Sequence, residues 1–292
     1  MIVNDNICST NLAAALKTAA LEFKLAGLDT PQLDARLLLQ SVMGIDQSAL
    51  ISASEQALTD GQVQQFNEFI KCRLMHRPVH RIIGEKEFWG MRLKISDAVL
   101  DPRADTECLV EAVLTHLDQQ RGKNAEYRIA DIGTGSGAII LALMGELTNA
   151  IGVATDISDD ALEIARYNAA RHGLEARIAF LQGSYLKPLS GRFDVIVSNP
   201  PYIPTSDILL LEPEVRDNDP QIALDGGGDG LDAYHALFNE SAKLVKPEGR
   251  VFFEIGHDQA SEIAQLAAQS GWHDVRISKD YGGNDRVFAA SH

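Results

Sequence analysis

The sequence has few cysteines and no clustered metal ligands. Its three cysteines, Cys8, Cys72 and Cys108, are far apart, with no C-x-x-C motif and no histidine at ligand spacing. This pattern indicates a reducing compartment and argues against a structural zinc site, so we expect no metal. None of the 8 histidines lies beside a candidate nucleophile in the sequence. We therefore assign no catalytic role to histidine.

Positive charge and long apolar runs are also scarce. Lys and Arg number 26 against 41 Asp and Glu, for a formal net charge of −15, which disfavours non-specific binding to nucleic acid. No apolar run approaches the ~20 residues that cross a membrane, and the N-terminus lacks the basic-then-apolar pattern of a signal peptide. We expect a cytoplasmic, monomeric protein without membrane contacts, and its acidity suits a basic protein partner.

The N-terminal part of the chain has a helical pattern from about residue 10 to 80. An apolar stripe from Leu12 to Phe23 predicts a first helix that Gly27 closes. Thr30 as cap and Pro31 at the first helical position predict the start of a second helix. A third helix is expected around residues 63–70. Apolar stripes of this kind form a core far more often than a cofactor site.

Beyond this part, the periodicity changes. Residues 87–96 alternate as a strand does and predict a hairpin or an extended connector. From residue 127 onward, strands and helices alternate, which is typical of a parallel sheet with helices on both faces. Later strands are expected at 174–181, 250–254, 273–278 and 286–290, with the closing pair antiparallel. The fold class is therefore α/β, preceded by a small helical domain.

A glycine-rich loop follows the first strand of the α/β region. Residues 131–137 read D-I-G-T-G-S-G, between a short strand at 127–130 and an apolar helix start at 138–143. Glycine lets the backbone approach a ligand closely, and the helix N-terminus offers N–H groups to an anion. The spacing departs from the dinucleotide pattern G-x-G-x-x-G, and no Gly-Lys-Ser/Thr follows, so triphosphate binding is not expected. Alone, such a loop is a weak signal.

An acidic residue ends the next predicted strand. Asp156 closes the stretch 151–156, at about the distance where a Rossmann-like unit places its ribose-binding carboxylate. Ser158 can cap the helix that follows. The order of strand, glycine loop, helix, strand and acid favours a ribose-binding role for Asp156. The alternative is a carboxylate that only caps the helix.

The sequence Asn199-Pro200-Pro201-Tyr202 follows an apolar run at 193–197 that predicts a buried strand. Consecutive prolines end the strand and stiffen the loop, because they cannot donate to a ladder and push the preceding backbone into an extended form. Ligands of open α/β sheets bind at the carboxyl ends of the strands. The loop therefore places an amide, an aimed carbonyl and an aromatic ring at the ligand-binding edge. The alternative is a proline-rich turn without function.

In this order, the motifs resemble those of the class I S-adenosylmethionine-dependent methyltransferases. More narrowly, the chain resembles the HemK/PrmC-type protein-(glutamine-N5) methyltransferases, which modify peptide chain release factors. Further matches extend over nearly the whole chain, at residues 77–78, 84–89, 102–107, 223–231, 254–256 and 285–287. The chain departs from the family at Ala104, where proline is usual, and at Ser184, where aspartate is usual.

The resemblance implies three segments. They are a helical substrate-recognition domain at 1–82, a β-hairpin linker at 83–104 and a Rossmann-like methyltransferase domain at 105–292. It also implies the residues that bind S-adenosylmethionine: Asp131, Gly133, Thr134, Gly135, Ser136, Gly137, Asp156, Tyr185 and Asn199. Asn199, Pro200 and Tyr202 are the expected catalytic residues, and together with Pro201 they are expected to bind the substrate.

The implied reaction moves a methyl group to the side-chain amide nitrogen of glutamine, in the Gly-Gly-Gln segment of class 1 release factors. An amide nitrogen is a poor nucleophile because its lone pair is delocalised, so the site must hold and aim it. The Asn199 side-chain carbonyl and the Pro200 backbone carbonyl would accept its N–H bonds, and Tyr202 would lie against the flat amide.

Other activities remain open on the sequence alone. A glutamine methyltransferase of a ribosomal protein is the closer alternative, and the N-terminal helical region should discriminate it from a methyltransferase of release factors. A DNA or RNA methyltransferase acting on amino groups would share the Asn-Pro-Pro-Tyr chemistry, although the acidic charge argues against nucleic acid as the direct substrate. A cofactor-binding scaffold without activity is disfavoured, because every catalytic position is present. The acid-rich segment 212–232 is either a surface loop or a substrate lid.

Overall fold

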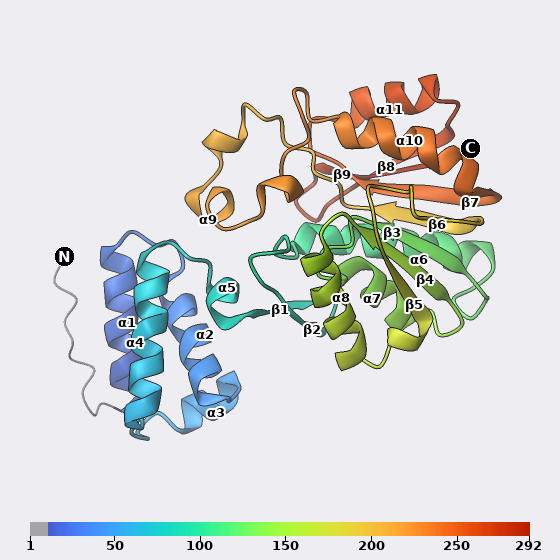
Figure 1. The fold of residues 1–292 in the computed structure, drawn as a ribbon. Helices are drawn as coiled ribbons and strands as arrows, with labels where there is room; N and C mark the ends of the chain where they lie inside the picture. Colours follow the sequence, from blue (N-terminus) through green and yellow to red (C-terminus); the bar gives the residue numbers. More distant parts are fainter. Residues whose placement is uncertain (1–10) are drawn as a thin grey trace. The chain divides into compact units, whose positions relative to one another are not determined.

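The computed structural model describes residues 11–292, so Cys8 lies outside the described part. The chain divides into two compact units, of which the first ends at Gly84 and the second covers Glu85–His292. Both are drawn in Figure 1. In the described part, no helix is long and apolar enough to cross a membrane.

The first unit is helical. Its helices are α1 (Leu12–Leu25), α2 (Pro31–Met43), α3 (Gln47–Ser52), α4 (Asp60–Leu74) and α5 (Val79–Ile83). The expected helices α1, α2 and α4 are confirmed, and their apolar faces form one core around Phe23 and Phe66. The short helices α3 and α5 were not predicted. Thr30 is the N-cap residue of α2 and Pro31 follows it, as expected, but the Thr30 hydroxyl donates to Asp34 Oδ1 at 2.7 Å and makes no capping hydrogen bond to the backbone.

A β-hairpin opens the second unit. Strands β1 (Glu85–Phe88) and β2 (Met91–Lys94) pair antiparallel across a turn in which Trp89 and Gly90 have φ angles of 51° and 69°. Positive φ at both central residues is what a tight hairpin turn requires. The buried side chains of Phe88 and Leu93 join the same core as helices of the α/β region. The hairpin is thus packed onto the second unit.

A seven-stranded sheet forms the centre of the second unit, in the order β5-β4-β3-β6-β7-β9-β8. Its strands are β3 (Arg128–Ile132), β4 (Ile151–Asp156), β5 (Ile178–Gln182), β6 (Phe193–Ser198), β7 (Val245–Glu254), β8 (His273–Lys279) and β9 (Asp285–Ser291). Strands β3 to β7 are mutually parallel, whereas β9 pairs antiparallel with both β7 and β8. This confirms the expected parallel sheet with an antiparallel closing pair.

Two strands start more than two residues away from the predicted position. Strand β7 begins at Val245, before the expected start at 250. The strand expected at 174–181 begins only at Ile178, because Glu175–Arg177 forms a 3-10 turn that connects helix α8 to β5. Helices α6 (Glu107–Gln120), α7 (Ala138–Glu146) and α8 (Asp159–Arg171) cover one face of the sheet. Helices α10 (Asp232–Leu244) and α11 (Ala260–Gln269) cover the other, as Figure 1 shows.

The strand order reverses beside β3, since the chain runs outward through β4 and β5 and then returns to β6 on the other side of β3. Open α/β sheets bind ligands at such a switch point, at the carboxyl ends of the strands. The loops that follow β3, β4 and β6 all begin at this edge. Because β6 and β7 are parallel, with Ser198 opposite Phe253, the next residues Asn199 and Glu254 also reach this edge.

Candidate active site

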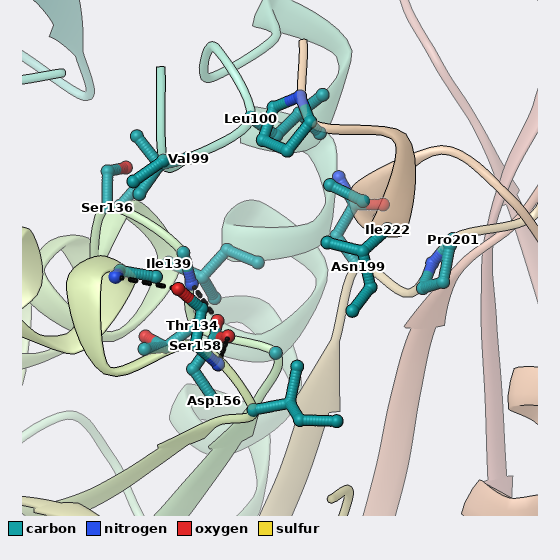
Figure 2. A pocket seen from close by; sticks show the side chains of 18 of the residues that line it. Val99, Leu100, Thr134, Ser136, Ile139, Asp156, Ser158, Asn199, Pro201 and Ile222 are labelled. Atoms are coloured by element: carbon teal, nitrogen blue, oxygen red, sulfur yellow. Dashed lines mark hydrogen bonds between the residues drawn. The ribbon is translucent and has the colours of Figure 1, made fainter. Parts of the chain in front are cut away.

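A cavity of about 300 Å³ lies at this edge of the sheet. The loops after β3, β4, β5 and β6 line it, together with residues 98–106 and the segment 220–225. Figure 2 shows Thr134, Ser136 and Asp156 on one side and Asn199 and Pro201 on the other. The volume is at the lower end of the range for small-molecule sites. The sequence motifs thus meet around a single cavity.

The glycine loop is fixed by hydrogen bonds to strand β4. The N–H groups of Gly133 and Thr134 both donate to the carbonyl of Thr155 at 2.9 Å, and the N–H of Gly135 donates to Asp156 Oδ2 at 2.9 Å. Gly133 and Gly135 have φ angles of 71° and 54°, in the region that side chains rarely enter. The loop therefore presents backbone to the cavity in a set conformation.

Asp131 lies beneath this loop and does not line the cavity. Its Oδ2 accepts a 2.6 Å hydrogen bond from the Thr134 hydroxyl, whereas Oδ1 accepts no hydrogen bond of ordinary geometry from the described residues. Burial raises the pKa of Asp131 to about 7, against the opposing effects of the Thr134 hydroxyl and the Ile140 N–H. A buried carboxylate oxygen without a hydrogen-bond partner is unusual, and Oδ1 of Asp131 is such an oxygen among the described residues.

Gly137, at the start of α7, also stays outside the cavity lining. A Cβ atom there would lie 3.2 Å from Leu141 Cδ1 and 3.3 Å from Ala165 Cβ, and its φ is +84°. The structure thus uses this glycine to bring α7 close to α8.

Asp156 lines the cavity and is partly exposed. Its Oδ1 accepts from the N–H of Ser158 at 3.0 Å, and its Oδ2 accepts from Gly135. The side-chain cap of α8 is Ser158, which accepts from the N–H of Ala161 at 3.2 Å. Burial raises the pKa of Asp156, and the backbone donors oppose that shift. The carboxylate therefore ties the glycine loop to the next loop while facing the cavity.

Tyr185 lines the cavity in the loop after β5. Its backbone has a φ of 50° and its carbonyl accepts a 3.0 Å hydrogen bond from the Thr155 hydroxyl. A tyrosine at positive φ is uncommon, and here that bond holds it. Ser184, which replaces the usual aspartate, lines the cavity next to it.

Asn199 and Pro201 line the cavity, but Pro200 and Tyr202 do not. The Asn199 amide nitrogen donates to Thr106 Oγ1 at 3.2 Å. The Tyr202 hydroxyl donates to Glu254 Oε1 at 3.4 Å. Burial raises the pKa of Tyr202 above its usual range, so the phenol stays protonated.

Neighbouring backbone segments hold this loop from behind. The N–H of Ile203 donates to the Leu224 carbonyl at 3.0 Å, and the Gln259 side chain donates to the Tyr202 carbonyl at 3.0 Å. Gly230 packs so closely that a Cβ atom there would lie 2.5 Å from the Tyr202 carbonyl oxygen, and its φ is +77°. These contacts give a rigid loop and explain why glycine occupies position 230.

The segment 220–225 forms one wall of the cavity. Its Pro220, Ile222, Ala223 and Asp225 line the space. Asp219 accepts a 2.5 Å hydrogen bond from Arg103, in an ion pair that joins this wall to the segment after the hairpin.

Two models of known protein families match the chain. Residues 14–84 match the PrmC N-terminal domain, and residues 105–209 match the Methyltransferase small domain. The chain is 45% identical to a release factor glutamine methyltransferase from Bradyrhizobium diazoefficiens, over 99% of this chain and 97% of the relative. It is 42% identical to one from Agrobacterium fabrum, over 97% of this chain and 96% of that relative. The chain belongs to the release factor glutamine methyltransferase family.

Solved structures support the fold of this family member. The catalytic domain of human METTL16, in complex with an RNA hairpin, matches with a TM-score of 0.55 at 16% identity, over 80% of this chain and 81% of that one. The N-terminal domain of human METTL16 in complex with SAH matches with a TM-score of 0.51 at 18% identity, over 70% of this chain and 76% of that one. Both confirm the expected Rossmann-like methyltransferase fold.

The family member's cavity brings together most of the residues predicted for its site. Those that line it are Gly133, Thr134, Gly135, Ser136, Asp156, Tyr185, Asn199 and Pro201. Asp131, Gly137, Pro200 and Tyr202 lie behind the lining. Their individual functions stay predictions.

Thr106 and Glu254 received no role from the sequence, yet they lie directly behind Asn199. The Thr106 hydroxyl donates to Glu254 Oε2 at 2.7 Å, and Glu254 is 1% exposed. Burial raises the pKa of Glu254 to about 7, and the Thr106 hydrogen bond and the Arg286 charge oppose the shift. One signal could have found Glu254: an acidic residue ends an apolar strand, at the edge where other strands place their functional groups.

Proposed function

We propose that this release factor glutamine methyltransferase family member transfers a methyl group from S-adenosylmethionine to the side-chain amide nitrogen of a glutamine in a peptide chain release factor. One observation carries the proposal. A single cavity has the glycine loop and Asp156 on one side and the Asn199 amide on the other. This arrangement suits a cofactor and a planar amide in contact.

The residues around the cavity fit S-adenosylmethionine. The Asp156 carboxylate faces the cavity and would accept from the ribose hydroxyls, and Tyr185 would cover the adenine. Gly133 and Gly135 present backbone to the methionine portion. Asp131 lies beneath the glycine loop and would orient that loop through the Thr134 hydroxyl, and its negative charge would attract the positive ammonium group of the cofactor.

Thr134, Ser136 and Gly137 complete the proposed cofactor loop. Thr134 and Ser136 line the cavity, and Gly137 lets α7 start in close contact with α8. Ala138 and Ile139 bring the N-terminal end of α7 to the cavity, where it would face the ligand. The bound cofactor supplies an electrophilic methyl group on a sulfonium centre. The chain's own residues then have to hold the acceptor.

Asn199 is the centre of the proposed acceptor site. Its Nδ2 donates to Thr106, so Oδ1 is the end of the amide that remains for the substrate N–H. The Pro200 carbonyl would accept the second N–H, and Pro201 and Tyr202 would confine the flat amide. These acceptors gain strength as positive charge develops on the nitrogen in the transition state. No strong base is needed before attack, because the proton becomes acidic only afterwards.

The helical domain, residues 1–82, is proposed to recognise the protein substrate. Every cofactor motif lies in the second unit, whereas the first matches the PrmC N-terminal domain. The net charge of −15 favours a basic protein surface over nucleic acid as the partner.

The test compares the transfer of labelled methyl groups to different candidate substrates. The enzyme is incubated with methyl-labelled S-adenosylmethionine and, in parallel, with a purified release factor, with ribosomal proteins and with DNA or RNA. We expect label in the release factor. Label in nucleic acid alone would overturn the protein substrate, and label in a ribosomal protein alone would move the activity to that target.

A further inference from the structure

We propose that Glu254 is a positioning residue that, through the hydroxyl of Thr106, fixes which end of the Asn199 amide faces the substrate. The inference rests on the proposed function, because Asn199 is taken to grip the glutamine amide. It assigns a role to a buried carboxylate that touches neither the cavity nor the reacting atoms.

The contacts form one continuous chain. Asn199 Nδ2 donates to Thr106 Oγ1 at 3.2 Å, and the Thr106 hydroxyl donates to Glu254 Oε2 at 2.7 Å. Thr106 is 4% exposed and Glu254 is 1% exposed, so water does not compete for these bonds. Thr106 is in a short 3-10 segment, Ala104–Thr106. Asn199 directly follows strand β6, and Glu254 ends the adjacent parallel strand β7.

The direction of each bond follows from the chemistry of the groups. An ionised carboxylate only accepts hydrogen bonds. The Thr106 hydroxyl must therefore donate its single proton to Glu254. Toward Asn199 it can only accept, through its lone pairs. The Asn199 NH₂ group is then the end that fits Thr106. Oδ1 is left as an acceptor for the N–H of a substrate amide.

A second arm reaches the same carboxylate from Tyr202. The Tyr202 hydroxyl donates to Glu254 Oε1 at 3.4 Å. The two oxygens of Glu254 thus accept from both sides of the Asn-Pro-Pro-Tyr loop, one directly and one through Thr106. Loss of the carboxylate would loosen both Asn199 and Tyr202.

Protonation of Glu254 would reverse the arrangement. A protonated carboxyl is a donor, and with Glu254 donating to Thr106, the Thr106 proton would point at Asn199 and favour Oδ1 in place of Nδ2. The substrate N–H would then meet an NH₂ group. Two donors facing each other form no hydrogen bond, so the grip would fail in this form.

Several groups around Glu254 set its titration. Arg286 of β9 lowers the pKa of Glu254, Asp105 raises it, and burial is the largest effect, so that the pKa is about 7. Arg286 also pairs with Asp280 at 3.1 Å and with Asp105 at 3.4 Å. Tyr234 of α10 donates to the backbone carbonyl of Glu254 at 2.8 Å. The hydrogen bond from the neutral Tyr202 phenol lowers the pKa of Glu254.

The test is the pH profile of methyl transfer to a purified release factor, measured from about pH 5.5 to 9 under saturating cofactor. We expect the wild-type kcat to fall on the acid side with an apparent pKa near that of Glu254. Glu254→Gln should lack the acid limb, because an amide does not titrate in this range. It should also lower kcat by up to about 10²-fold, the scale for a misplaced catalytic group, because the single amide oxygen can accept from only one of Thr106 and Tyr202. Cofactor affinity should change little. Glu262→Gln, the same change at an exposed position of α11, should behave as wild type.

Thr106 provides an independent variant if Glu254→Gln does not fold. Thr106→Val removes the hydroxyl with little change in volume and should cause a similar loss of kcat. Thr106→Ser restores the hydroxyl and should recover most of the activity. A Thr106→Val enzyme with wild-type kcat and pH profile would overturn the relay, as would an acid limb that persists unchanged in Glu254→Gln.

A measurement without substrate separates this inference from the proposed function. With ¹⁵N-labelled asparagine in the full-length chain, the Asn199 side-chain amide signal should titrate together with Glu254 in the wild type. It should lose that titration in Glu254→Gln and in Thr106→Val. An Asn199 signal that is insensitive to both substitutions would overturn the inference. A wild-type enzyme that leaves the release factor unmodified would refute only the proposed substrate.

Discussion

Replacing Asp156 by alanine tests the cofactor side of the cavity. The carboxylate accepts one backbone hydrogen bond on each oxygen, from Ser158 and from Gly135. A carboxylate has about four lone-pair positions, so acceptor positions remain for the ribose hydroxyls. The side chain is partly exposed at the cavity wall, where a hydrogen bond is weaker than in a dry interior.

These features set the size of the effect. Hydrogen bonds to a charged group contribute about 1.5–3 kcal/mol each, and partial exposure moves the expected loss toward the lower values. We expect Asp156→Ala to weaken S-adenosylmethionine binding by about 1–3 kcal/mol, which is about 5- to 150-fold in Kd. The released Gly135 N–H adds to the loss, because the glycine loop is no longer tied to β4 at that point.

The assay is isothermal calorimetry with S-adenosylmethionine and the full-length chain, after circular dichroism has shown the variant to be folded. Asp160→Ala is the matched control. It removes the same charge from the exposed first turn of α8 and should leave Kd nearly unchanged, because solvent screens exposed charges. An Asp156→Ala chain that is folded and binds with wild-type affinity would refute the ribose role.

Three further outcomes are expected. Asn199→Ala should lower kcat about 10²-fold, the usual loss for one preorganised electrostatic partner, with a much smaller change in cofactor Kd; wild-type turnover would reject the amide grip. A folded chain of residues 85–292, cut where the two units divide, should still bind cofactor by calorimetry but not methylate an intact release factor; full activity would show that the helical domain is not a recognition element. Without cofactor, the pKa of Asp131 is raised from 3.8 to about 7, so its stabilising effect is present at acid pH and is lost as pH rises through 7. The Tm of the wild type relative to Asp131→Asn should therefore fall by several degrees between about pH 5 and 8, at about 2–4 °C per kcal/mol; parallel Tm curves would contradict this.

The sequence predicted which edge of the sheet carries the site, because its motifs lie at the carboxyl ends of predicted strands. The glycine loop follows β3, Asp156 ends β4 and Asn199 follows β6. Since the carboxyl ends of parallel strands share one edge, these residues had to meet once the strands were identified. Thr30 occupies the predicted N-cap position of α2, but its hydroxyl donates to a side chain, Asp34, and residue propensities do not predict that choice of partner.

The contacts behind the site could not be predicted in this way. The hydrogen bond between Thr106 and Glu254 joins residues that are 148 positions apart, and the one between Arg103 and Asp219 joins residues 116 positions apart. Such pairs depend on how a 3-10 turn and a loop pack on the finished sheet. The local pattern of apolar and polar residues does not predict that packing. Glu254 could have been suspected only from its place at the end of a buried strand.

The central claim is that the cavity delivers a methyl group to a glutamine amide. The most direct measurement is fragmentation mass spectrometry of a release factor methylated by the enzyme, with the methyl group located on a single atom. We predict one added methyl on the side-chain nitrogen of the glutamine in a Gly-Gly-Gln segment, present with wild-type enzyme and strongly reduced with Asn199→Ala. A methyl group on a carboxylate, a lysine or the backbone, or one that Asn199→Ala leaves undiminished, would contradict the claim.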